Sequence, residues 1–216
     1  MTIKAVIFDL DGTLLNTLED LTDSTNYALS CFGYPTRTIE EISSFVGNGV
    51  VKLIERAIPN GDDNSDFYVC LKTFKDHYKN NMQNKTKSYT GITELLKKLK
   101  AKGIKTAVVS NKFDAAVKGL TEKYFKGLID ISIGENEAEG ISKKPAPDMV
   151  LKAIEELKTD RASVIYVGDS DTDILTAQNT QIPCVSVSWG FRTKEFLKQN
   201  GASTIIDTPS ELLNLL

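Results

Sequence analysis

Apolar residues recur along this chain with two different periods, and the change of period divides it into two regions. Between residues 16 and 87 the apolar positions follow a helical spacing, with no convincing strand. The clearest series is Phe67, Leu71, Phe74, Tyr78 and Met82. We therefore expect an all-helical region, with helices at Leu18–Phe32, up to Phe45-Val46, over Val50–Ile58 and over Phe67–Met82.

The remainder of the chain alternates short apolar runs with helical stripes. The runs predict strands at Ala5–Phe8, Ile104–Val109, Ile129–Ile133, Val164–Val167, Cys184–Val187 and Thr204–Ile206. Helices are expected over 92–102, 114–124, 148–157, 172–179 and 194–200. Strands that alternate with helices imply right-handed crossovers and a parallel sheet covered on both faces. The sequence thus predicts a doubly wound α/β core, residues 1–15 and 88–216, that carries residues 16–87 as a helical insertion.

Composition narrows the function classes. The chain has 216 residues, a net charge of −3 and a pI near 5.4, which argues against nucleic acid as a main partner. Its three cysteines are far apart and form no metal-type spacing, which is typical of free thiols in a reducing compartment. No apolar run approaches the length of a membrane span, and acids interrupt the first apolar run. We expect a soluble cytoplasmic protein, either a monomer or a weak homodimer.

Polar residues gather where the expected core strands end. Asp9 and Asp11 follow the first strand, and Ser110-Asn111 follows the next. Asp169 and Asp173 come directly after Val164–Val167. Lys144 stands just before a proline-stiffened helix start. Because the carboxyl ends of parallel strands share one sheet edge, these groups are expected to form one site.

This set of side chains suits phosphoryl transfer. Asp9 can attack phosphorus and form an aspartyl-phosphate, while Asp11 protonates the leaving oxygen and later activates water. A carboxylate approaches an anionic phosphate only when charge is neutralised, which requires a metal ion and a cation. We expect Mg²⁺ to be bound by Asp9, the main-chain carbonyl of Asp11 and Asp169. Asp173 is either a further ligand or an acceptor that orients water on the ion.

The phosphate of the substrate needs partners of its own at this edge. Lys144 and the Ser110 hydroxyl can hold its oxygens, and Asn111 belongs to the same group. Asp171, between the two acids of the last motif, is interpreted as a solvated acid or cap at a helix start. Lys143 is interpreted as a surface charge.

These residues resemble a known family. Asp9-x-Asp11-Gly12-Thr13-Leu14, Ser110-Asn111, Lys144-Pro145 and Gly168-Asp169-Ser170-x-x-Asp173 are similar, in order, to the four motifs of the haloacid dehalogenase (HAD) superfamily. The insertion after the first motif resembles its C1-type cap. Phe45-Val46-Gly47-Asn48-Gly49, Ser188-Trp189-Gly190-Phe191 and the closing segment 201–212 resemble phosphoglycolate phosphatases. The resemblance implies a Mg²⁺-dependent phosphomonoesterase with Asp9 as nucleophile.

Two positions depart from the family pattern. The second connection reads Tyr89-Thr90-Gly91, where relatives often have proline before the glycine, and Asn16 stands where many have aspartate. Neither touches the chemistry, although both bear on how a cap would move. The cap hinges are expected near Leu15-Asn16 and Ser88–Gly91.

Other residues carry open interpretations. Gly47, Asn48 and Gly49 form either an ordinary turn or a cap loop that closes over substrate. His77, the only histidine, has no metal-type spacing and is interpreted as structural. Trp189 either lines the site or packs, with packing favoured.

The preferred function is hydrolysis of a small phosphorylated metabolite, with 2-phosphoglycolate as the first candidate. The same chemistry on pyrophosphate, a nucleotide monophosphate or a sugar phosphate is the alternative. A mutase that resembles β-phosphoglucomutase is disfavoured because those relatives usually carry valine at the position of Thr13. A signalling receiver domain would need no helical insertion, and a phosphate-binding module without activity would not need the complete set of acids, serine and lysine.

Overall fold

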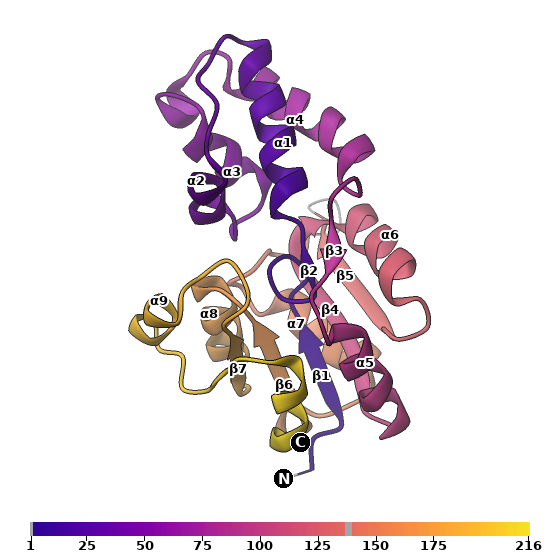
Figure 1. Cartoon of the computed structure of the whole chain (residues 1–216). Coiled ribbons are helices and arrows are strands. Elements are labelled where there is room, and N and C mark those ends of the chain that lie inside the picture. Colours follow the sequence, from indigo (N-terminus) through magenta and orange to yellow (C-terminus); the bar gives the residue numbers. More distant parts are fainter. Residues whose placement is uncertain (1, 137–139) are drawn as a thin grey trace. The chain divides into compact units, whose positions relative to one another are not determined.

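The computed structural model describes residues 2–136 and 140–216. The chain forms two compact units (Figure 1), one made of Met1–Leu15 with Ser88–Leu216 and the other of Asn16–Lys87. We call the first the core unit and the second the helical unit.

The core unit is built on a parallel sheet of six strands in the order β5-β4-β1-β6-β7-β8. The strands are β1 (Ala5–Phe8), β4 (Lys105–Phe113), β5 (Ile131–Glu135), β6 (Val164–Gly168), β7 (Cys184–Val187) and β8 (Ile205–Ile206). Every neighbouring pair is parallel, and β1 lies between β4 and β6 with Phe8 opposite both Val108 and Val167. This confirms the predicted doubly wound α/β fold.

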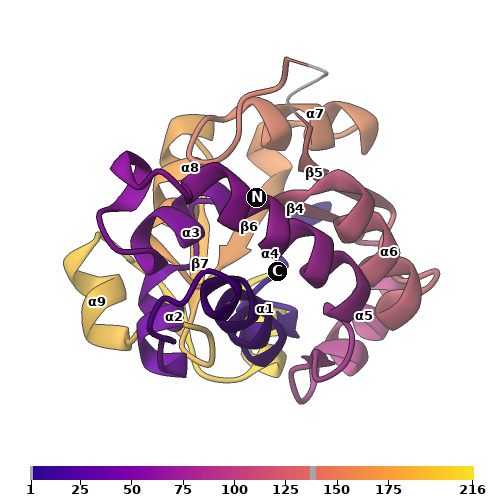
Figure 2. The ribbon, with the colours of Figure 1, turned by 90° about the horizontal axis from the view of Figure 1, so that it is seen from above.

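Helices cover both faces of the sheet, as the continuous apolar character of the strands requires. The core helices are α5 (Ile92–Ala101), α6 (Asp114–Phe125), α7 (Asp148–Glu156), α8 (Asp171–Thr180) and α9 (Lys194–Gln199), with 3₁₀ turns η3 (Arg161–Ser163) and η4 (Pro209–Leu215). Figure 2 shows α5 and α6 on one side of the sheet and α7 and α8 on the other.

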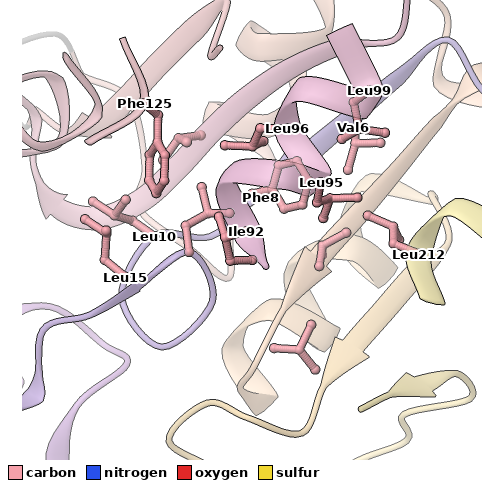
Figure 3. Packing of buried hydrophobic residues seen from close by; sticks show 14 of the residues in the cluster. Val6, Phe8, Leu10, Leu15, Ile92, Leu95, Leu96, Leu99, Phe125 and Leu212 are labelled. Atoms are coloured by element: carbon pink, nitrogen blue, oxygen red, sulfur yellow. The ribbon is translucent and has the colours of Figure 1, made fainter. Parts of the chain in front are cut away.

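Alternate residues of β1 point to the two faces. Val6 and Phe8 pack in one cluster with residues of α5, α6 and η4, and Figure 3 shows Leu95, Leu96 and Leu99 of α5 around them. Ala5 and Ile7 pack in a second cluster, with residues of α7 and α8. Each fully buried leucine, isoleucine or phenylalanine in these clusters contributes about 1.5–3 kcal/mol to stability. The strand that leads to Asp9 is therefore tightly packed on both faces of the sheet.

The helical unit contains α1 (Leu18–Cys31), α2 (Ile39–Phe45), α3 (Val50–Ala57), a 3₁₀ turn η1 (Gly61–Asp63) and α4 (Phe67–Asn81). These helices begin and end within a residue or two of the predicted bounds. Thr38 begins α2 as a capping box with Glu41, which satisfies two amides at that helix start. Among the described residues, no helix is both long and apolar enough to cross a membrane.

Two details differ from the sequence prediction. Short strands β2 (Leu15–Asn16) and β3 (Lys87–Ser88) pair where the chain enters and leaves the helical unit, and two residues are too few to show a period of two. β4 also continues to Phe113 instead of ending at Val109, with a shift of its register against β5 between those residues. Ser110 and Asn111 consequently lie within an irregular strand end rather than in a loop.

The order of the strands in the sheet indicates where a ligand would bind. From β1 the chain builds outward through β4 to β5, then crosses back to β6 and continues to β7 and β8. The reversal of strand order lies at β1, and ligands of doubly wound folds bind at the carboxyl ends of strands at such a point. The acids that follow β1 and β6, and Ser110 and Asn111 in the last part of β4, are among the residues singled out from the sequence.

Candidate active site

Three buried carboxylates meet at the carboxyl edge of the sheet. Asp9 follows β1, whereas Asp169 and Asp173 follow β6, and one oxygen of each lies within 4.8 Å of the others. All three side chains are buried. Residues 160 positions apart in sequence are thus brought together by the pairing of β1 with β6.

Lys144 is the cation of this cluster. Its Nζ lies 2.9 Å from Asp9 Oδ1 and 2.8 Å from Asp173 Oδ1, and its side chain is only 2% exposed. The backbone of Lys144 is fixed by Asn111, whose side chain both accepts from Lys144 N (2.8 Å) and donates to Lys144 O (3.0 Å). Asn111 therefore positions the lysine through the backbone, a role that the sequence did not indicate.

Asp173 is held from every side by protein groups. Its Oδ1 accepts from Lys144 Nζ and from the Tyr166 hydroxyl (3.0 Å), and Tyr166 also lies 3.1 Å from Lys144 Nζ. Its Oδ2 accepts from Ser170 Oγ (2.6 Å) and from the amides of Asp169 and Ser170. Asp173 is also the third residue of the Ser170 capping box that begins α8. These bonds fix the position of Asp173, with one of its oxygens within 4.8 Å of an oxygen of Asp9 and an oxygen of Asp169.

Asp169 is oriented by the loops around it. Its Oδ1 accepts from Thr13 Oγ1 (3.2 Å) and its Oδ2 accepts from the Phe191 amide (2.7 Å). The backbone comes so close that a Cβ on Gly190 would lie 2.2 Å from Asp169 Cβ. Trp189 of the same loop donates through Nε1 to the Thr13 carbonyl (3.0 Å), so that it ties this loop to the turn after β1.

The charge balance of the cluster leaves negative charge in excess. Burial raises the pKa of Asp9 to about 7, even though Lys144 beside it acts in the opposite direction. Burial, followed by the charges of Asp173 and Asp9, raises the pKa of Asp169 well above its usual range. Burial lowers the pKa of Lys144, but Asp173 and Asp9 outweigh it, so the net direction is upward.

The raised pKa values of the lysine and of the acids have different consequences. Lys144 remains charged because Asp9 and Asp173 both contact it, whereas the single positive charge of Lys144 does not neutralise the three acids. A divalent cation with oxygen ligands would supply the missing charge, and the donor set is the hard-oxygen type that Mg²⁺ prefers. The buried aspartates therefore fit a metal site.

Asp11 lies beside this cluster and has a different cation. Lys112 Nζ is 3.0 Å from Asp11 Oδ1 and 3.1 Å from Oδ2. Ser110, buried at the same strand end, accepts a 3.3 Å hydrogen bond from the Lys112 amide through Oγ. Lys112 was not among the residues singled out from the sequence; its position directly after Ser110-Asn111 was the available signal.

The other residues singled out from the sequence have contacts of their own. Gly47, Asn48 and Gly49 belong to the helical unit, where Arg56 donates to Asn48 Oδ1 (2.8 Å) and to the Phe45 carbonyl (2.6 Å). Lys143 is partly exposed, 3.6 Å from Glu135. Asp171 opens α8, 4.0 Å from Arg192. His77 stacks on Tyr27 and hydrogen-bonds Ser24 through Nδ1, which is a structural role.

Comparison with known proteins agrees with this geometry. The model of the haloacid dehalogenase-like hydrolases matches residues 6–187. A "Putative pyrophosphatase PpaX" from Caldanaerobacter subterraneus subsp. tengcongensis is 34% identical over 222 residues, covering 100% of this chain and 96% of that one. A "Phosphoglycolate phosphatase" from Psychrobacter arcticus is 32% identical over 224 residues, covering 100% and 96%.

A solved structure is similar over the whole length. The crystal structure of a "putative phosphoglycolate phosphatase" from Lactobacillus delbrueckii subsp. bulgaricus superposes with a TM-score of 0.94 at 38% identity, covering 100% of this chain and 98% of that one. The chain is therefore a haloacid dehalogenase-like hydrolase, related to phosphatases of that family.

Proposed function

We propose that this protein is a Mg²⁺-dependent phosphomonoester hydrolase that works through an aspartyl-phosphate on Asp9, and that its substrate is 2-phosphoglycolate. The observation that carries the proposal is the position of Asp9. Its Oδ1 is bound by Lys144 Nζ and by the Leu10 amide (2.7 Å), beside a second buried acid, Asp169, that faces the same point. This arrangement places the Asp9 carboxylate where it can attack a substrate phosphate whose charge is neutralised by Lys144 and a metal ion.

The first step forms a bond between a carboxylate oxygen of Asp9 and phosphorus, and it breaks the bond from phosphorus to the ester oxygen. Asp11 gives its proton to that leaving oxygen. Lys144 and the Ser110 hydroxyl bind the equatorial phosphate oxygens, where charge spreads in the transition state. In the second step, water attacks the phosphorus, Asp11 takes the proton of the water, and the carboxylate of Asp9 is released.

Asp9, the Asp11 carbonyl and Asp169 would hold the Mg²⁺ ion. When bound, the ion neutralises charge between the carboxylate and the phosphate. Asp173 serves the reaction indirectly in this proposal, because it holds Lys144 and the amides of the loop after β6. Residues 1–15 and 88–216 then form the catalytic core.

We assign substrate selection to the helical unit, residues 16–87, as the cap of the enzyme. Its Gly47-Asn48-Gly49 turn is ordered by the hydrogen bond of Arg56 with Asn48. An ordered turn with glycines on both sides offers amides to an anionic substrate group. Asn48→Ala is expected to raise KM for the preferred substrate more than it lowers kcat.

Pyrophosphate is the second candidate substrate, because a relative that is 34% identical over the full chain bears the name of a pyrophosphatase. Both substrates require the same attack by Asp9, so the site residues alone do not separate them. The relative named for phosphoglycolate is nearly as similar, at 32% identity.

The test is phosphate release from a panel of substrates, with Mg²⁺ and with a chelator. The panel contains phosphoglycolate, pyrophosphate, a nucleotide monophosphate, a sugar phosphate and p-nitrophenyl phosphate. We expect the highest kcat/KM with phosphoglycolate and no turnover with chelator. A higher kcat/KM with pyrophosphate than with phosphoglycolate would make pyrophosphate the assigned substrate. Absence of turnover of the whole panel would contradict the proposed activity.

A further inference from the structure

We propose that Lys112 is a positioning residue for Asp11: it binds both oxygens of this carboxylate and holds the proton-transfer group at the angle that the leaving oxygen requires. The inference rests on the proposed function and adds a residue to it. It is carried by the contact itself, with Lys112 Nζ at 3.0 and 3.1 Å from the two Asp11 oxygens.

The backbone around Lys112 is fixed by close packing. Lys112 lies in the irregular end of β4, and β5 passes directly behind it at Gly134. A Cβ on Gly134 would lie 2.6 Å from the Lys112 carbonyl oxygen, so only glycine allows this approach. The Gly134 amide also donates to Asp114 Oδ1 (3.1 Å), at the start of α6. The backbone of Lys112 is thus held in place by the close packing of β4 against β5.

Burial distinguishes this contact from the ion pairs on the surface. The Lys112 side chain is 3% exposed and that of Asp11 is 14% exposed, whereas in the pair of Lys143 with Glu135 the lysine is 39% exposed. A buried ammonium without a partner is costly, and a buried pair resists rearrangement more than an exposed one does. The Asp11 carboxylate is therefore held in one orientation before a substrate arrives.

Orientation matters for the role assigned to Asp11. A proton passes efficiently only when donor and acceptor are within hydrogen-bond reach, and an ill-placed group loses most of its effect. One ammonium that contacts both oxygens limits rotation of the carboxyl group about its bond to Cβ. The same contact stabilises the carboxylate that remains after Asp11 has given its proton to the leaving oxygen.

The dependence on the leaving group provides the test. An alkyl phosphate has a poor leaving group that needs the proton from Asp11, whereas an aryl phosphate leaves well without it. Phosphoglycolate and p-nitrophenyl phosphate serve as the two substrates, at saturating Mg²⁺. In Lys112→Met we expect kcat/KM to fall at least about 10-fold for phosphoglycolate and less than about 3-fold for p-nitrophenyl phosphate, since general acid catalysis contributes about 10²–10⁴-fold in total.

Three further variants make the test specific. Lys143→Met removes a lysine at the partly exposed pair and is expected to leave both values unchanged. Lys112→Arg keeps a cation that can contact both oxygens and is expected to recover turnover of phosphoglycolate. In an Asp11→Asn background, Lys112→Met should add almost nothing, because a residue that acts through Asp11 has no effect once Asp11 is lost.

The ratio of the two kcat/KM values within one preparation does not depend on the folded fraction, so partial unfolding of Lys112→Met cannot imitate the expected result. Equal losses on both substrates, a gain of activity, or multiplied losses in the double variant would overturn the inference and leave the proposed function standing. Failure of the wild-type protein to hydrolyse either ester would overturn both.

Discussion

Two buried aspartates, one in each unit, show how different the same side chain can be. Asp20 in α1 of the helical unit accepts from the Lys85 amide (2.9 and 3.1 Å) and the Thr86 amide (2.8 Å). Asp9 in the core unit shares Lys144 with Asp173, beside Asp169. Backbone amides donate to both oxygens of Asp20, whereas Asp9 lies among like charges that one lysine does not balance.

This difference distinguishes an acid that stabilises the fold from acids suited to binding a cation. A carboxylate bound by backbone amides stabilises the segments that it joins, here α1 and the residues before β3. Crowded carboxylates that share a cation are unfavourable for stability and are suited to binding a further cation. Substitution of each aspartate tests whether the two differ in this way.

The largest effect is expected at Asp9. Replacement by asparagine keeps the size of the side chain but removes the proposed nucleophile, so kcat should fall by at least about 10³-fold. The melting temperature should not fall, because the change removes one of the crowded charges. Steady-state phosphate release and thermal unfolding measure the two quantities, and retention of full activity in Asp9→Asn is incompatible with the mechanism.

Asp20→Ala is expected to show the opposite profile. The amides of residues 85 and 86 lose their buried acceptor, which costs about 1–3 kcal/mol of unfolding free energy. Urea unfolding measures the loss. Asp23→Ala is the matched control, because Asp23 pairs with Lys85 at the surface and its side chain is 49% exposed. If Asp23→Ala lowered the unfolding free energy as much as Asp20→Ala does, the buried amide contacts of Asp20 would have no special part in stability.

Tyr166→Phe tests the hydrogen bonds that hold Lys144, the cation of the proposed mechanism. The hydroxyl donates to Asp173 and lies 3.1 Å from Lys144 Nζ, so its loss should lower kcat about 3- to 10-fold, the value of one hydrogen bond of about 0.5–1.5 kcal/mol. Tyr34→Phe is the control, since the Tyr34 hydroxyl bonds Asp66 and Asn64 within the helical unit. We expect kcat of Tyr34→Phe to remain unchanged, and equal losses of kcat in both variants would contradict a specific role of Tyr166.

The smallest effect concerns pH and the metal ion. Without metal, burial raises the pKa of Asp9 from its ordinary 3.8 to about 7, so between these values the folded state binds more protons than the unfolded state. Stability of the metal-free protein therefore falls as the pH rises through this window. In the proposed mechanism Mg²⁺ binds the deprotonated cluster, so it should raise the melting temperature more near pH 8 than near pH 5.5, by about 2–4 °C per kcal/mol of binding free energy.

Thermal unfolding with and without Mg²⁺, at matched ionic strength, measures this difference. In Asp9→Asn the dependence on pH should shrink, because one titrating ligand is lost. The same Mg²⁺ shift at both pH values would show that the cluster does not couple the ion to a proton.

Much of this protein was determined by local pattern. Apolar runs and helical stripes predicted the parallel core, the helical insertion and most element bounds, because period and burial are properties of short segments. The acids after β1 and β6 were recognisable because charged residues directly after a buried strand are costly without a role. Lys144 was recognisable by its place before a proline-stiffened helix start.

Only the tertiary structure decided which of these groups meet and what each one holds. Lys112 and Asp11 are 101 residues apart, and their contact depends on the register of β4 beside β1 and on the close approach of β5. The saturation of Asp173 by Tyr166, Ser170 and Lys144 depends equally on packing across the sheet. Such pairings arise from the register of distant segments, which no local period encodes, and they separate Asp9, the acid proposed to attack, from the acids around it.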